Sequence, residues 1–382
     1  MEKCFHFISM PTLWFFQVFI SRTIWQNPKT FLNILYDGPF SADPKGGIVR
    51  YFHEISRGIS NENKVFFSRK PNGRFAKGIH LPPFAHFRPH RISFYLEYLW
   101  HKYFSNLEID IVHPTEFQLS QTGSFYLRKG AKLVITIHDL IHEKFGAPGN
   151  LYSKAYRTNF YNQADGYIFV SKSTRNDFAE FYPELFETRP SKVIWHGCNF
   201  SINEQENQKR RKQFLFVGSR EGYKNFTTAA QAFCKVADEY KDCTLVVAGA
   251  PPKSSERAIL KNYENQISWI EFPEEEQLRT LYAESVALLY VSKYEGFGMP
   301  LLEAMSQGCI PIAGNHSSIP EVLGKAGIKV NCESVHELSE AMGKYLADDS
   351  ETKNLVKRGY DRASLFTWGK SAELHTDFYT NL

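Results

Sequence analysis

Two glutamates, Glu295 and Glu303, bracket a glycine turn in the segment Glu-Gly-Phe-Gly-Met-Pro-Leu-Leu-Glu. Gly296 and Gly298 lack a Cβ atom and suit a tight turn, while Pro300 suits the first turn of a helix. The free amides at such a helix start attract anions and hydroxyl groups. A carboxylate can accept two parallel hydrogen bonds from a vicinal diol. We therefore interpret this segment as a sugar-binding turn; the alternative is a strand-to-helix connection with ordinary surface glutamates.

Two cations, Arg220 and Lys224, follow the apolar segment Phe214–Gly218. Gly222 lies between them and permits a curled turn in which both side chains point at one anion. Arginine offers a fork of donors to phosphate oxygens, and lysine offers a compact charge. The pair predicts a phosphate clamp, with which a diphosphate would need no divalent metal. An exposed basic loop is the alternative.

The first half of the chain holds two more candidate sites. His138 ends a strand-like segment and is followed by Asp139. A histidine at that position can hydrogen-bond a sugar hydroxyl, with the aspartate fixing its tautomer; a capped histidine in a turn is the alternative. Gly46 and Gly47 precede an amphipathic helical pattern, and amides there could approach a phosphate or an acceptor. A double glycine alone is more often a simple turn.

Residues 64–103 combine basic and aromatic side chains with a single acid, Glu97. This composition suits an anionic membrane surface or a lipid-diphosphate acceptor. A core-packing helix with a solvated basic face is the alternative. No nucleic-acid-binding motif accompanies the basic residues, so we expect no nucleic-acid partner. The basic residues are Lys64, Arg69, Lys70, Arg74, Lys77, Arg88, Arg91 and Lys102.

From Phe31 onward, short apolar runs alternate with helical patterns, which predicts parallel α/β sheets. The polar segment 201–212 separates two such series and predicts a linker. Ligands of such sheets sit beyond the carboxyl ends of the strands, where His138, Gly218 and Glu295 fall. The expected strands are Asn33–Tyr36, Lys64–Phe67, Ile111–His113, Leu133–His138, Tyr167–Val170 and Lys192–Trp195, then Phe214–Gly218, Thr244–Ala248, Ile267–Glu271, Ala287–Val291 and Ile310–Ala313.

The two ends of the chain differ in character. Residues 1–30 form an extension whose apolar stretch, Phe5–Ile20, is short for a bilayer span. An interfacial anchor, a packed extension and an upstream start with little structure remain alternatives for it. Thr367 suits the N-cap of a final helix within residues 365–382.

Composition excludes several classes of protein. A chain of 382 residues with 43% hydrophobic residues can build two domains. The net charge of +4 is too small for a general polyanion binder. Six scattered cysteines show neither C-x-x-C nor zinc spacing, which favours a reduced, cytoplasmic compartment. No G-x-G-x-x-G segment is present, which counts against a dinucleotide oxidoreductase. We expect neither a metal nor another cofactor.

The segment from Tyr290 to about Gly324 resembles the signature of retaining glycosyltransferases of family 4. This resemblance implies the GT-B fold, with two Rossmann-like domains, at residues 31–200 and 213–364, whose parallel sheets face an interdomain cleft. It further implies that residues 365–382 form a helix that returns to the first domain.

The resemblance also implies roles for the candidate residues. Glu303 would hold the ribose diol of a nucleotide-sugar donor, and Arg220 with Lys224 would hold its diphosphate. Glu295, His138 and the amides of the glycine turn would hold the sugar hydroxyls. The remaining donor-binding residues expected from the resemblance are Gly46, Gly47, Gly218, Gly296, Phe297, Gly298 and Met299.

The chain is similar to bacterial mannosyltransferases of surface polysaccharide assembly in the segments VGSREGYKNF and HDLIHE. We therefore expect transfer of mannose from GDP-mannose, with retention of configuration, to a growing polysaccharide on a lipid diphosphate at the inner face of the cytoplasmic membrane. A UDP-hexose donor is the first alternative. A GT-B epimerase or phosphorylase, and a non-catalytic sugar-nucleotide-binding protein, are the others.

Overall fold

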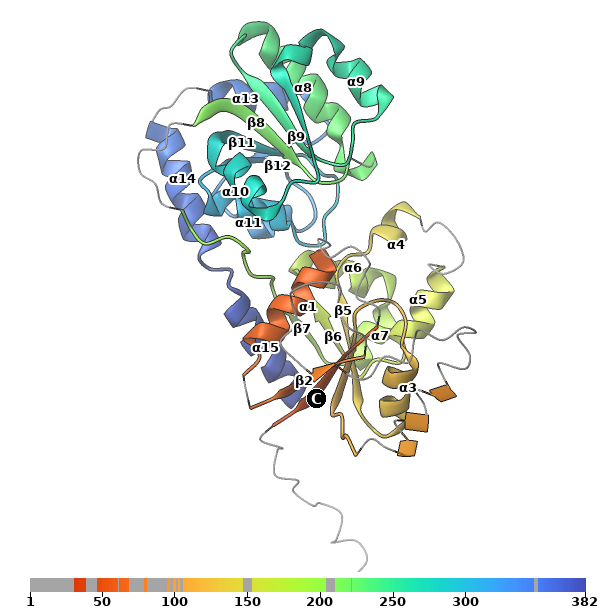
Figure 1. Ribbon diagram of the computed structural model, residues 1–382. Coiled ribbons are helices and arrows are strands. Elements are labelled where there is room, and N and C mark those ends of the chain that lie inside the picture. The colour runs from red at the N-terminus through yellow and green to blue at the C-terminus, as the bar shows by residue number, and fades with distance from the viewer. Residues whose placement is uncertain are drawn as a thin grey trace, which may run out of the picture.

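The computed structural model describes residues 31–38, 47–60, 62–68, 79–80, 95–96, 99–100, 102–103, 106–146, 153–203, 210–220, 222–346 and 350–382. These residues form two α/β domains, drawn one above the other in Figure 1. The expected extension 1–30, Gly46 and most of segment 64–103 lie outside the described residues. Within the described ranges, no helix is long and apolar enough to cross a lipid bilayer.

The N-terminal domain is built on a seven-stranded parallel sheet with the order β3-β2-β1-β4-β5-β6-β7. Its central strands are buried along their length because helices cover both faces. The strands are β1 (Asn33–Asp37), β2 (Lys64–Phe67), β3 (Ile79–His80), β4 (Ile111–Pro114), β5 (Lys132–Ile137), β6 (Gly166–Phe169) and β7 (Ser191–Val193). The helices are α1 (Gly47–Gly58), α3 (Gln121–Arg128), α4 (Ile141–Phe145), α5 (Lys154–Tyr161), α6 (Lys172–Phe181) and α7 (Pro183–Thr188).

The C-terminal domain has a six-stranded parallel sheet with the order β10-β9-β8-β11-β12-β13. The strands are β8 (Arg211–Val217), β9 (Thr244–Gly249), β10 (Ile267–Glu271), β11 (Ser285–Tyr290), β12 (Ile310–Gly314) and β13 (Ile328–Val330). The helices are η2 (Gly222–Lys224), α8 (Phe226–Glu239), α9 (Ser254–Leu260), η3 (Lys261–Gln266), α10 (Glu275–Glu284), α11 (Met299–Ser306), α12 (Ile319–Leu323), α13 (Val335–Lys344) and α14 (Ser350–Ala363). The last helix of the chain is α15 (Trp368–Thr380).

Every strand expected from the sequence is present, with ends that shift by a few residues. The predicted fold class, two Rossmann-like domains with parallel sheets, is confirmed. The sequence did not predict β3 and β13, which have two and three residues and are too short to show a periodic pattern. Strand β8 begins at Arg211, inside the segment 201–212 that was expected to be a linker.

The chain crosses between the domains twice, and the two crossings touch. The first crossing follows β7, and the second leads from α14 to α15. The amide of Cys198 donates to the carbonyl oxygen of Phe366 at 2.8 Å. A Cβ atom at Gly197 would lie 2.2 Å from the amide nitrogen of Trp368, so only glycine fits there. The crossings therefore form one packed junction.

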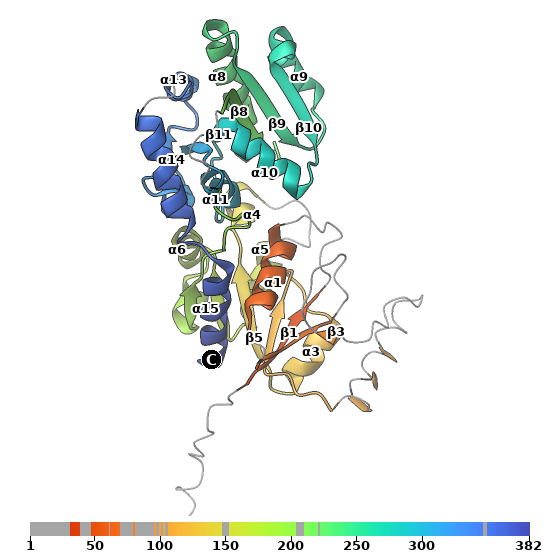
Figure 2. The same cartoon turned by 60° about the vertical axis from the view of Figure 1, so that its left-hand side comes forward.

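Helix α15 lies on the N-terminal domain beside α1, as Figures 1 and 2 show from two directions. Thr367 caps it by accepting from the amide of Lys370 at 3.2 Å. The buried face of α15 carries Ser371, His375 and Tyr379. The side chains of His375 and Tyr379 join a buried hydrogen-bonded network with the N-terminal domain, so the last helix belongs structurally to that domain.

Candidate active site

The glycine turn after β11 touches the N-terminal domain at Gly296. A Cβ atom there would lie 1.8 Å from the carbonyl oxygen of His138 and 3.0 Å from the Cβ atom of Asp139. The Thr174 hydroxyl, at the start of α6, donates to the carbonyl oxygen of Gly296 at 3.1 Å. Only glycine allows this approach. Two candidates from opposite halves of the sequence, His138 and Gly296, thus lie against each other where the domains meet.

The turn is held in shape by its own domain. The hydroxyl of Ser318 lies 2.9 Å from the carbonyl oxygen of Glu295 and 2.8 Å from that of Phe297. Gly298 has a φ of 109°, which disfavours other residues there. The Phe297 ring is buried and packs on His196 with ring centroids 4.7 Å apart. The side chain of Phe297 is therefore structural, and a ligand would meet this part of the turn through its backbone.

Glu295 and Lys224 form a close ion pair. The ammonium of Lys224 donates to both carboxylate oxygens of Glu295, at 2.7 and 2.9 Å. The Glu295 side chain is 10% exposed and that of Lys224 is 21% exposed. An ammonium has three donors, so Lys224 retains one for a ligand while Glu295 holds it in position. The pair joins two candidates that lie more than seventy residues apart in the sequence.

Glu303 lies buried in α11 and receives several donors. Its carboxylate accepts from the Asn199 amide at 2.9 Å and from the Tyr282 hydroxyl at 3.1 Å. Arg50 of α1, in the other domain, has a guanidinium nitrogen 3.9 Å from the same carboxylate and also pairs with Glu275 of α10. Burial raises the pKa of Glu303, and its hydrogen bonds and Arg50 oppose that shift.

Arg220 has partners of its own, apart from the Lys224–Glu295 pair. Its side chain is 3% exposed, and its Nε atom lies 3.0 Å from the carboxylate of Glu256. A second nitrogen donates to the carbonyl oxygens of Ala250 and Pro251, both at 2.8 Å. Glu256, in the first turn of α9, was overlooked as a competing partner. In this arrangement Arg220 anchors the loop, and Lys224 is the member of the pair that lies beside Glu295.

His138 is partly buried among aromatic rings. The Tyr51 ring packs edge-on against it, with centroids 4.9 Å apart. Burial lowers the pKa of His138 to about 4, and the neighbouring His375 adds to the effect. The imidazole is therefore neutral at pH 7. A neutral ring can both donate and accept a hydrogen bond.

The other glycine candidates fall at the ends of elements. Gly218 follows β8 with a φ of 106°, which favours glycine. Gly47 is the first residue of α1, and a Cβ atom there would meet nothing within 4 Å. Steric crowding therefore does not explain why residue 47 is a glycine. Met299 begins α11 and packs partly buried against the core of the C-terminal domain.

Sequence reasoning overlooked three residues that contact Glu303: Arg50, Asn199 and Tyr282. Arg50 lies within one turn of Gly47, so its position at a helix start was the available signal. Asn199 ends the first crossing and Tyr282 lies near the end of α10. Neither carries a sequence signal, because their relation to Glu303 arises from the packing of segments about a hundred and about twenty residues away.

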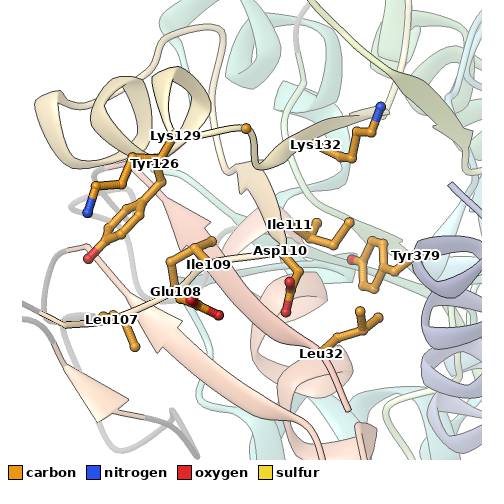
Figure 3. Close-up of a pocket in the computed structure, with 11 residues that line it drawn as sticks. Leu32, Leu107, Glu108, Ile109, Asp110, Ile111, Tyr126, Lys129, Lys132 and Tyr379 are labelled. Carbon is orange, nitrogen blue, oxygen red and sulfur yellow. The ribbon is translucent and has the colours of Figure 1, made fainter. Parts of the chain in front are cut away.

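A separate cavity lies at the opposite edge of the N-terminal sheet. It has a volume of about 500 Å³ and is lined by residues at the amino ends of β1, β4 and β5. Figure 3 shows Glu108 and Asp110 between Tyr126 and Tyr379 in this cavity. Ligands of such sheets bind at the carboxyl ends, so this cavity is not the candidate site. Among the described residues, no group of three or more potential metal ligands is arranged around a common point.

Two family models match the chain. The model described as Glycosyltransferase Family 4 matches residues 45–201, and the model described as Glycosyl transferases group 1 matches residues 199–362. The boundary between them falls at the first crossing.

Relatives with assigned functions align over parts of the chain. O-antigen chain mannosyltransferase B of Escherichia coli is 38% identical over 105 residues, which are 28% of this chain and 28% of that protein. The GDP-mannose:cellobiosyl-diphosphopolyprenol alpha-mannosyltransferase of Komagataeibacter xylinus is 29% identical over 119 residues, 30% of each chain. The aligned stretches thus span less than a third of these relatives.

Solved structures of other proteins superpose on most of this chain. The Anabaena protein HepE, crystallised with UDP and glucose, superposes with a TM-score of 0.67 and 17% identity, covering 92% of this chain and all of HepE. At this identity the likeness establishes the fold, which is GT-B. Taken with the two family models, which together span residues 45–362, it shows that the chain belongs to the glycosyltransferases of family 4.

Proposed function

We propose that this protein transfers a hexose, with retention of configuration, from a nucleoside diphosphate sugar to a hydroxyl group of a surface polysaccharide. The donor is GDP-mannose, and the acceptor is a growing chain on a lipid diphosphate at the inner face of the cytoplasmic membrane. Two similar proteins support this choice: one is named an O-antigen mannosyltransferase, and the other is named for GDP-mannose and a diphosphopolyprenol acceptor. Residues 64–103 would contact the anionic membrane surface.

The observation that carries the proposal is the meeting of Glu295, Lys224 and Glu303 with the His138–Gly296 contact at one domain boundary. Glu303 would accept from the ribose diol. The free donor of Lys224 would bind a phosphate oxygen and stabilise charge that builds up on the diphosphate as the glycosidic bond breaks. The neutral His138 and the turn amides would hold the sugar hydroxyls.

Both oxygens of Glu295 accept from Lys224, which makes this carboxylate a poor nucleophile. The pairing supports attack by the acceptor hydroxyl on the same face that the diphosphate leaves, through an oxocarbenium-like ion pair. The acceptor proton would pass to a leaving phosphate oxygen. Arg220 is already engaged by Glu256 and two carbonyl oxygens, so Lys224 carries the main electrostatic role.

The test is turnover of purified protein with a panel of GDP- and UDP-sugars and a lipid-linked saccharide acceptor. We expect GDP release coupled to a mannosylated product of retained configuration. A UDP-hexose as the sole productive donor would favour the second candidate donor, which the UDP-glucose complex of HepE supports. Free sugar and nucleotide without acceptor would indicate an epimerase, and a requirement for phosphate would indicate a phosphorylase. No turnover with any donor would contradict the proposal.

A further inference from the structure

The Glu303 carboxylate is held by donors from two segments that are far apart in the sequence. Asn199 at the first crossing donates to Oε1 at 2.9 Å, and Tyr282 of α10 donates to Oε2 at 3.1 Å. The carboxylate is buried, so its rotamer is fixed by these partners and by packing. A carboxylate oxygen can accept a second hydrogen bond, so both remain able to bind a diol.

The orientation of the Asn199 amide is set by a hydrogen bond from Trp368. The indole Nε1 of Trp368 lies 3.0 Å from Oδ1 of Asn199. An indole nitrogen can only donate, so the atom of Asn199 that faces it must be the oxygen. The NH₂ group of Asn199 is thereby turned toward Glu303. Without the indole donor the amide could rotate and present its oxygen to the carboxylate, which would repel it.

Trp368 is the first residue of α15 and lies at the second crossing. Asn199 lies at the first crossing, and the two crossings are already joined by the hydrogen bond from Cys198 to Phe366. The contact from Trp368 through Asn199 to Glu303 therefore connects the interdomain junction to a side chain of the candidate donor site.

We propose that Trp368 and Asn199 are positioning residues that orient Glu303 for the ribose diol of the donor. The inference rests on the proposed function, since it requires that Glu303 bind a nucleoside diphosphate. Its chemical target is the pair of ribose hydroxyls and not the base or the phosphates.

Trp368→Phe tests the chain of contacts because it deletes the N–H donor and keeps an aromatic ring. Calorimetry would measure the Kd of the wild type and the variant for GDP and UDP, and for the corresponding 2′,3′-dideoxy nucleotides. We expect the variant to bind the ribonucleotide roughly three- to tenfold more weakly, the size expected for one lost hydrogen bond. The dideoxy nucleotide lacks the diol, so its Kd should be equal for variant and wild type.

Trp195→Phe is the matched control. Its indole donates to Glu321 at 2.7 Å near the same junction and has no such bond to Asn199. This variant should bind both nucleotides within about twofold of the wild type. A double-mutant cycle adds a second test, because Trp368→Phe should have no further effect on Kd in the Asn199→Ala background.

Asn199→Ala alone should weaken ribonucleotide binding about 10- to 100-fold, since it removes a hydrogen bond to a charged group. This variant, measured in the same way, replaces Trp368→Phe if the latter does not fold. Equal weakening for ribo- and dideoxynucleotides, or wild-type affinity in both variants, would overturn the inference and leave the proposed function standing. A wild-type protein that binds neither GDP nor UDP would overturn both.

Discussion

Lys224 and Glu295 neutralise each other's charge in the absence of a donor, and the pair is only partly exposed. A phosphate that approaches Lys224 meets a cation already fixed in place, so little reorganisation is needed during the reaction. The carboxylate also limits how far the ammonium can move. At the scale of single residues, the site is therefore preorganised around one cation.

Replacing Lys224 with methionine removes that cation and keeps most of the side-chain volume. We expect kcat to fall roughly 10²- to 10³-fold, the usual loss for one preorganised donor that acts on transition-state charge. Initial rates at saturating donor would measure it. Lys212→Met is the matched control, because Lys212 pairs with Asp242 at 2.7 Å on an exposed surface and should keep wild-type rates. Equal rates in both variants would contradict the role of Lys224.

Gly296→Ala places a Cβ atom 1.8 Å from the carbonyl oxygen of His138, so the turn and the N-terminal domain must separate. We expect activity to fall at least about tenfold and stability to fall by about 1–3 kcal/mol, as for other overpacked contacts. Assays and urea unfolding would measure the two effects. Gly369→Ala, where a Cβ atom meets nothing within 4 Å, should leave both unchanged. An active, stable Gly296→Ala protein would show that the observed contact is dispensable.

At the scale of elements, α15 is attached to the N-terminal domain by a directed chain of hydrogen bonds. His375 Nδ1 lies 2.7 Å from the Ser371 carbonyl, which can only accept, so this nitrogen carries the hydrogen. His375 Nε2 then accepts from Tyr51, 2.6 Å away. The Tyr51 oxygen in turn accepts from Thr136, at 2.9 Å.

This series of hydrogen bonds continues to β4 and returns to α15. The Thr136 hydroxyl already donates its hydrogen bond to Tyr51, so His113 Nε2 must donate to Thr136, at 2.9 Å. His113 Nδ1 then accepts from Tyr379 of α15, at 2.7 Å. Both histidines of this network, His113 and His375, are neutral because burial lowers the pKa of each. Such a buried network rigidifies the helix attachment because each lost member leaves an unpaired polar group.

Tyr51→Phe interrupts this chain in the middle. It leaves His375 Nε2 without a donor and frees the Thr136 hydroxyl, so we expect a loss of about 1–3 kcal/mol in the free energy of unfolding. Hydrogen exchange should also accelerate in α15. Urea denaturation and exchange measurements would test both. Tyr95→Phe, at a side chain that is 61% exposed, is the control and should be neutral. An equally small effect at both positions would refute the network's contribution.

The sequence predicted the elements better than their contacts. Strands such as β2 and β10 were predicted to the residue because apolar runs between turn residues report burial directly. The turn at Gly296 was predicted because Gly296 and Gly298 suit a tight turn and Pro300 suits a helix start. The partners of each side chain were harder: Glu256 for Arg220 and Asn199 for Glu303 lie far along the chain, and no local pattern encodes such pairs.

At the scale of the whole molecule, the domains are joined by a carboxylate that caps a helix of the opposite domain. Glu321 of α12 accepts from the amide of Lys172, which begins α6, with its two oxygens at 2.8 and 3.0 Å. It also accepts from the indole of Trp195. The negative charge lies at the positive end of the α6 dipole. The two bonds to the Lys172 amide fix the angle between the domains, whereas Trp195 lies on the connecting segment after β7.

Glu321→Ala should loosen that angle without unfolding either domain. We expect a broader distribution of shapes in small-angle scattering and a several-fold fall in kcat, because the site draws on both domains. Glu340→Ala, at a side chain that is 66% exposed on α13, should match the wild type in both measurements. If the Glu321→Ala protein is as rigid and as active as the wild type, contacts other than those of Glu321 hold the two domains in place.

Buried histidines make the N-terminal domain sensitive to acid. Burial lowers the pKa of His138 and of His375 to about 4, below the ordinary value of 6.5. The unfolded chain therefore binds more protons than the folded one between these values. Stability is fully present above about pH 6.5 and falls as the pH drops toward 4. Urea unfolding at pH 7.5 and pH 5.0 should show a lower free energy at pH 5.0; equal values would contradict neutral burial.

The central claim is that one nucleoside diphosphate sugar binds between the domains, against Lys224 and Glu303. The most direct measurement is calorimetric titration of GDP-mannose into the wild type, Lys224→Met and Glu303→Gln. We predict a single site in the wild type and an affinity at least about tenfold lower in each variant, because each loses a hydrogen bond that involves a charged group. Wild-type affinity in both variants, or no binding of GDP- or UDP-sugars to the wild type, would contradict it.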